Sequence, residues 1–129
     1  MASALYTDFK EELLKGTHDL LNDTIKVVLI DAADYTFSAA HTQLSQVAAG
    51  AQVASATLAG VSVTNGVVDA SDTTVSSVSG DEFEAVILYN DTDANDALIC
   101  YIDSITATTP NGNDILITWD NGANKIFSL

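Results

Sequence analysis

The chain of 129 residues is long enough for one domain with a hydrophobic core and too short for two of ordinary size. It has 18 acidic residues, four lysines and no arginine, a formal net charge of −14 at pH 7. Because contacts with nucleic acids rely on Lys and Arg, this balance excludes nucleic-acid binding and disfavours anionic membranes. No apolar run approaches the roughly 20 residues that span a bilayer, and the first residues lack the pattern of a signal peptide.

The first segment, residues 5–21, predicts an amphipathic helix. Apolar side chains recur there at a spacing of three to four residues, from Leu5 to Leu21, with charged residues between them. Thr7 is a candidate N-cap. Gly16 weakens the helix by about 1 kcal/mol relative to Ala, so the helix stops or bends there.

A β-rich body is expected over residues 24–129, which with the helix forms a single domain. Its first strand, residues 24–31, is apolar on both faces and therefore belongs inside a sheet that is covered on both sides. A second short helix is predicted over residues 39–50, with Ser38 as its cap and Gly50 at its end.

From residue 51 to residue 80 the chain contains little besides Val, Ser, Thr, Ala, Gly and Asp, in an alternation typical of strands. Asn65-Gly66 predicts a tight hairpin, because both residues tolerate a positive φ. The small side chains favour either an ordinary outer sheet or close contacts between subunits.

Three apolar strands follow, within residues 83–90, 97–104 and 114–120. A loop over residues 108–114 precedes the last of these strands. That strand is expected to form a hairpin with a closing strand, residues 125–129. The predicted fold is α+β: mainly an antiparallel β-sandwich or barrel-like sheet, with the N-terminal amphipathic helix and the second short helix.

The segment "NDTDANDA" places Asp91, Asp93 and Asn95 at the first three ligand positions of an EF-hand loop. The pattern then fails, because Asp96 replaces the glycine of the sixth position and Ile102 the glutamate of the twelfth. The segment is therefore interpreted as a hairpin loop. Two alternatives remain for this segment: a loop that contacts a partner, and a loose cation site that includes Asp91, Asp93 and Asp96.

Other polar residues carry no catalytic or metal-binding pattern. The acidic pair Asp69 and Asp72 lacks the aromatic platforms that accompany glycosidase carboxylates, since Trp119 is the single tryptophan and is expected to cover the end of the core. His18, on the polar side of the first helix, and His41, in the second, have no further ligand at zinc spacing. We predict no catalytic, cofactor-binding or metal residues, and no cofactor.

The lone cysteine, Cys100, lies within the apolar run "ALICYI". A free cysteine in such a run usually packs as a small hydrophobic side chain, and no neighbouring residue would activate it as a nucleophile. We therefore expect Cys100 to be buried and inert.

Three segments together resemble a group of small tailed-bacteriophage proteins: "LYTDFKEELLKGTHDLLNDTIKVVLID", "GVVDASDTTVSSVSGDEFEAVILYND" and the ending "YIDS…TPNGNDILITWDNGANKIFSL". Similar proteins open with an "LYTDFK" helix and close on a "WDNGANKIF" hairpin, so the resemblance covers nearly the whole chain. It implies a virion structural protein without enzymatic role, and no functional residue comes with it.

Within that group, the resemblance favours a head decoration or cement protein, located in the virion and bound to the major capsid protein or other virion proteins. Association with itself is expected, with a trimer favoured by the symmetry of capsids. In this hypothesis the Ser/Thr/Val strands and Trp119 lie near contacts and the acidic loops face outward. The alternatives are a tail component (tube, terminator, baseplate or fibre adaptor) and a carbohydrate- or receptor-binding module, which requires Trp119 and Tyr89 or Tyr101 to be exposed together.

Overall fold

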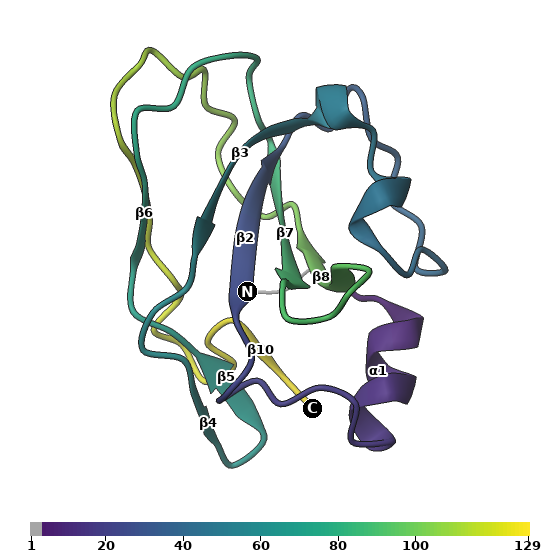
Figure 1. Cartoon of the computed structure of the whole chain (residues 1–129). Helices are drawn as coiled ribbons and strands as arrows, with labels where there is room; N and C mark the ends of the chain where they lie inside the picture. The colour runs from purple at the N-terminus through teal and green to yellow at the C-terminus, as the bar shows by residue number, and fades with distance from the viewer. Residues whose placement is uncertain (1–3) are drawn as a thin grey trace.

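The computed structural model describes residues 4–129, and a five-stranded antiparallel sheet with strand order β1–β8–β7–β2–β3 forms its centre (Figure 1). Its strands are β1 (Ala4–Leu5), β2 (Ile25–Ile30), β3 (Gln52–Thr57), β7 (Ala85–Asn90) and β8 (Ala97–Ile102). Every residue of β7 and β8 is buried, and in β2 only Lys26 is partly exposed. The prediction of an internal strand at residues 24–31 is confirmed, because β2 pairs with β3 on one side and β7 on the other.

Two smaller antiparallel sheets complete the β structure. The first has the order β10–β5–β4 and the second pairs β6 with β9. Their bounds are β4 (Ser62–Thr64), β5 (Val67–Asp69), β6 (Thr73–Val75), β9 (Ile115–Ile117) and β10 (Phe127–Ser128). The predicted turn at Asn65-Gly66 is confirmed: it joins β4 to β5, with φ of 53° and 75° at its two residues.

The predicted hairpin between residues 114–120 and 125–129 is wrong, because β9 pairs with β6 and β10 pairs with β5. Trp119 turns the chain away after β9: its backbone N–H donates to Asp72 Oδ1 and its indole N–H to Thr73 Oγ1. Phe127 of β10 packs edge-on against Phe9, with 5.9 Å between ring centroids. Burial of Trp119 and Phe127 therefore decides the pairing over the nearby turn residues.

The N-terminal helix is shorter than predicted. Helix α1 spans Thr7–Leu14, whereas the sequence indicated residues 5–21. Gly16 has a φ of +84°, a left-handed conformation that stops an α-helix, and Leu5 lies in β1 opposite Cys100. The N-cap position is held by Tyr6 rather than Thr7, with no side-chain cap. No helix of residues 4–129 has the length and apolar character to cross a membrane.

The second short helix is also a wrong prediction. Residues 39–50 contain two short 3₁₀ turns instead, η1 (Leu44–Gln46) and η2 (Ala49–Ala51, which extends one residue past the predicted end). Gln43 is extended and bridges to Ala97, the first residue of β8. Ser38 accepts the N–H of Ala40 within a turn, so it caps no helix. Pairing of this segment with β8 prevents an α-helical path.

The fold is thus α+β, with three mostly antiparallel sheets, one α-helix and two 3₁₀ turns in the described residues. In Figure 1, α1 and the 3₁₀ turns lie on one side of β7 and β8, and β6 lies on the other. The buried apolar side chains form a cluster that includes residues from α1 and from all three sheets.

Candidate functional site

The acidic segment Asp91–Asp96 forms the turn between β7 and β8, as the sequence indicated. Asp93 Oδ1 accepts the N–H of Asn95 at 2.8 Å, and Asp96 adopts a φ of 52°. Asp91 lies 3.5 Å from the Lys26 ammonium. Burial, followed by the charge of Asp91, raises the pKa of Asp96 above its usual range. These side chains shape the turn, Lys26 pairs with one of its three carboxylates, and the three carboxylates do not converge on one point.

The carboxylates that do converge, among residues 4–129, are those of Asp31, Asp34 and Asp81, which each place one oxygen within 4.8 Å of the other two. Asp31 is buried at the end of β2, and its Oδ1 accepts the N–H of Ala33 at 2.9 Å. Oxygen ligands of this kind could hold a hard cation such as Ca²⁺, although exposed acidic groups also gather without one. Sequence spacing missed this acidic cluster, because Asp81 joins it from a distant loop.

The prediction that His18 lies on the polar side of the first helix is wrong. His18 follows α1 and is buried, with 7 % of its surface exposed. Asn90 Oδ1 accepts the N–H of Thr92, so the Asn90 amide group faces Asp23 Oδ2 at 2.8 Å and His18 Nδ1 at 3.0 Å. This network assigns the ring proton of neutral His18 to Nε2, which is buried without a partner. His18 therefore ties the segment after α1 to β7, and it has no metal-binding arrangement.

An aromatic network occupies the side of the sheet near α1. The hydroxyls of Tyr6 and Tyr35 lie 3.0 Å apart, and the Tyr35 hydroxyl lies 2.8 Å from His41 Nδ1. Burial raises the pKa of Tyr6 and of Tyr35 above the ordinary tyrosine value. His41 is thus part of a polar contact at the edge of the core, and it follows a turn at residues 39–40 rather than lying in the predicted helix.

The aromatic residues that could stack on a sugar are buried. Trp119, Tyr89 and Tyr101 have 2 %, 5 % and 7 % of their surfaces exposed. Trp119 belongs to the buried core cluster. The condition set for a carbohydrate-binding module is therefore not met. Cys100 is likewise buried, and its burial raises the thiol pKa to about 12.

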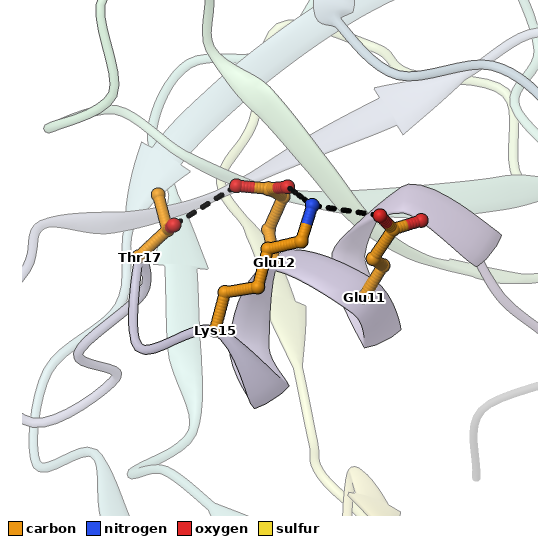
Figure 2. A network of polar contacts seen from close by, with 4 residues as sticks. All are labelled: Glu11, Glu12, Lys15 and Thr17. Atoms are coloured by element: carbon orange, nitrogen blue, oxygen red, sulfur yellow. Dashed lines mark hydrogen bonds and ion pairs between the residues drawn. The ribbon is translucent and has the colours of Figure 1, made fainter.

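The end of α1 is held by a polar network, which Figure 2 shows at close range. The Lys15 ammonium lies 2.7 Å from Glu11 Oε1 and 3.0 Å from Glu12 Oε1, and the Thr17 hydroxyl donates to Glu12 Oε2 at 2.9 Å. The hydrogen bond from Lys15, and to a smaller extent the one from Thr17, lowers the pKa of Glu12. The hydrogen bond with Glu11, and to a smaller extent the one with Glu12, raises the pKa of Lys15. Lys15 is therefore occupied by its own helix.

An apolar groove of about 500 Å³ lies between the segment that follows α1 and the β10–β5–β4 sheet. Figure 1 shows these parts at the same end of the molecule, with the C-terminus between them. The side chains on which its apolar character depends are Leu13, Leu20, Leu21, Val63, Phe127 and Leu129. Among the described residues, five large hydrophobic side chains are exposed, and three of them line this groove: Leu21 (59 %), Val63 (43 %) and Leu129 (69 %). Gathering of exposed apolar surface in one place is typical of a docking surface.

The wall of the groove that follows α1 is fixed by its own carboxylates. Asp19 Oδ1 accepts the N–H groups of Leu21 and Asn22 at 3.1 and 3.3 Å, and its Oδ2 accepts the Asn22 amide at 2.6 Å. Asp23 Oδ2 accepts the N–H of Asp19 and the Asn90 amide. The Asn22 side chain holds the pKa of Asp19 below its usual range. A preorganised negative charge therefore borders the apolar surface.

A second apolar pocket, of about 160 Å³, lies beside β9 between Trp119, Phe83 and Ile105. Leu116 lines it and is 62 % exposed. This pocket is smaller than the groove, and Leu116 is the one strongly exposed aliphatic side chain among those that line it.

A scan against protein-family models and a search of curated proteins find no match for this chain. The resemblance to small bacteriophage proteins therefore rests on the three sequence segments alone. The groove, the acidic cluster at Asp31 and the buried polar network at His18 are properties of this chain that sequence patterns did not indicate.

Proposed function

We propose that this protein is a non-catalytic structural component of a tailed-bacteriophage virion, most simply a decoration or cement protein on the outer surface of the head. The observation that carries the proposal is the exposed apolar groove at one end of an otherwise acidic molecule. The sequence resemblance favours a bacteriophage virion as the particle, and the groove is a surface by which the protein can attach to it.

The physical character of the body supports this function. A cement protein must stay folded without a cofactor and act as a rigid block, and here the buried strands β7 and β8 place apolar side chains on both faces of the main sheet. We propose a sandwich-like rather than a closed arrangement, because β1 and β3 are the two ends of the five-stranded sheet and do not pair. The acidic exterior keeps released copies soluble.

The partners in this proposal are the major capsid protein or another virion protein, with self-association into a trimer as a further part of it. Ser62 and Thr64 of the outer strand β4 are exposed, do not line the groove and belong to the Ser/Thr/Val region that could contact a neighbouring copy. Trp119 supplies no such contact surface, since it is buried.

Localisation in the particle tests the proposal. Cryo-electron microscopy of the virion, with quantitative mass spectrometry of the copy number, should find many copies arranged with the symmetry of the head lattice. A handful of copies confined to the tail would favour the tail alternative and overturn decoration of the head. Absence of the protein from purified virions would overturn a structural role altogether.

A further inference from the structure

We propose that the apolar groove binds a partner protein through a segment that presents aliphatic side chains next to a lysine or arginine. Leu21, Val63 and Leu129 take the aliphatic side chains, and Asp19 faces the basic one. This inference rests on the proposed function and deepens it, because it assigns the attachment surface and the chemistry of the partner.

The groove has the composition of a binding surface rather than of ordinary solvent-exposed surface. Leu21, Val63 and Leu129 come from three separate parts of the chain, and the buried side chains of Leu20 and Phe127 form the base between them. Apolar surface of this kind is stabilised when another apolar surface removes it from water. Aliphatic side chains are the chemically matched occupants.

Charge selects a basic partner over a second copy of this chain. Each copy carries −14, so a second copy that approaches the groove is repelled, and the trimer contacts of the proposed function lie outside the groove. Three of the four lysines already face carboxylates of their own chain: Lys15 faces Glu11 and Glu12, Lys26 faces Asp91 at 3.5 Å, and Lys125 faces Asp69 at 3.8 Å. A segment that carries lysine or arginine is attracted instead, and complementary charge raises both the association rate and the specificity.

Asp19 is positioned to act as the polar group of the groove. Its two oxygens accept N–H groups from Leu21 and Asn22, which hold the carboxylate in place and favour its charged form. Because Asp23 and Asn90 anchor the same wall to β7, binding requires little ordering of this segment. A fixed carboxylate beside exposed leucine matches a basic residue beside an aliphatic one.

Peptide binding tests the chemistry. The probe is an acetylated, amidated hexapeptide with two central leucines flanked by lysines, and its counterpart carries glutamates instead. In a titration followed by ¹⁵N NMR, the lysine peptide should shift the amide signals of Asp19, Leu21 and Val63 and bind at least tenfold more tightly than the glutamate peptide. Leu21→Ser should weaken binding about tenfold, whereas Leu116→Ser, which alters a leucine of nearly equal exposure in β9, should not. Asp19→Asn should reduce the preference for lysine.

Three results would overturn the inference. The first is equal binding of the two peptides, and the second is an equal effect of Leu21→Ser and Leu116→Ser. The third is concentration-dependent self-association in sedimentation velocity that Leu21→Ser abolishes, because a second copy would then occupy the groove. Overlaid melting curves of the variants verify that each remains folded.

Binding to purified virions that lack the protein separates this inference from the proposed function. If the wild-type chain attaches and Leu21→Ser attaches as well as Leu116→Ser does, the groove is not the attachment surface, while the structural role stands. If no chain attaches although the lysine peptide binds in the groove, the virion role fails. Attachment that Leu21→Ser weakens and Leu116→Ser preserves supports both.

Discussion

Replacement of Phe9 by alanine tests how α1 is held to the body. Helix α1 has eight residues, fewer than the roughly 12–15 that an isolated helix needs in water, and Phe9 is its one buried residue. The ring is 1 % exposed, packs edge-on against Phe127 and lies 5.4 Å from His18. Removal of a buried phenylalanine costs about 3–5 kcal/mol, and the higher helix propensity of alanine returns at most about 0.5 kcal/mol. We expect Phe9→Ala to lower the free energy of unfolding by about 2.5–4.5 kcal/mol.

The matched control is Leu14→Ala in the same helix. Leu14 is 86 % exposed, so its replacement should change the free energy of unfolding by less than about 0.5 kcal/mol. Urea unfolding followed by the fluorescence of Trp119 measures both variants, because this single tryptophan is buried in the body. Hydrogen exchange should show that the amides of α1 lose protection in Phe9→Ala. A difference between the variants below about 1 kcal/mol would refute the view that Phe9 anchors the helix.

Three further changes probe buried and turn positions. Burial raises the pKa of the Cys100 thiol from 9.0 to about 12, so the unfolded chain loses this proton first as the pH rises. The wild type should therefore lose about 1.4 kcal/mol of stability per pH unit between pH 9 and 12 through this thiol, and Cys100→Ala should lack that loss in urea unfolding. An equal slope in the two proteins would contradict burial of the thiol. Gly66 has a φ of +75°, so Gly66→Ala should lower the free energy of unfolding by about 1 kcal/mol and lower the melting temperature. Gly50 has room for a Cβ and no positive φ, so Gly50→Ala should not lower the melting temperature. Equal melting temperatures of the two variants would exclude strain at the turn. Asp34→Asn should raise the melting temperature at low salt, because it relieves repulsion in the acidic cluster. A melting temperature that rises with added Ca²⁺ in the wild type but not in Asp34→Asn would show instead that the cluster binds a cation.

Local sequence signals predicted the strands well. β2, β7 and β8 are runs of apolar residues long enough to be buried on both faces, and such runs have few alternatives to the centre of a covered sheet. The turn at Asn65-Gly66 likewise depends on the backbone freedom of its own two residues. These elements are specified by residues that are neighbours in the chain.

Elements that depend on distant contacts were predicted less well. The closing strand β10 leaves its neighbour β9 for β5, because Phe127 reaches the ring of Phe9 and Trp119 is tied to Thr73. The 3₁₀ turns replace a helix for a related reason, since Gln43 pairs with Ala97 of β8 in the main sheet. No window of sequence contains both partners of these contacts.

The candidate site could not be predicted from the sequence for the same reason. Its side chains come from the segment after α1, from the β4–β5 hairpin and from the C-terminal strand, and none of these segments has a binding motif. The acidic segment at Asp91 was the more conspicuous pattern, yet it forms a turn. Exposure of apolar side chains, rather than any residue type, distinguishes the site.

The end of α1 connects the fold to the proposed attachment surface. If the helix had continued to residue 21, Leu20 and Leu21 would follow its helical spacing, about 100° apart around one axis. Because Gly16 adopts a left-handed conformation, the chain instead leaves the helix and runs on to β2, with Leu20 buried at 9 % exposure and Leu21 exposed at 59 %. Asp19 then stabilises this path by accepting the N–H of Leu21, and the same hydrogen bond places its carboxylate beside the exposed leucine. The helix therefore ends before the leucine at the base of the groove, the leucine exposed on it and the carboxylate that borders it.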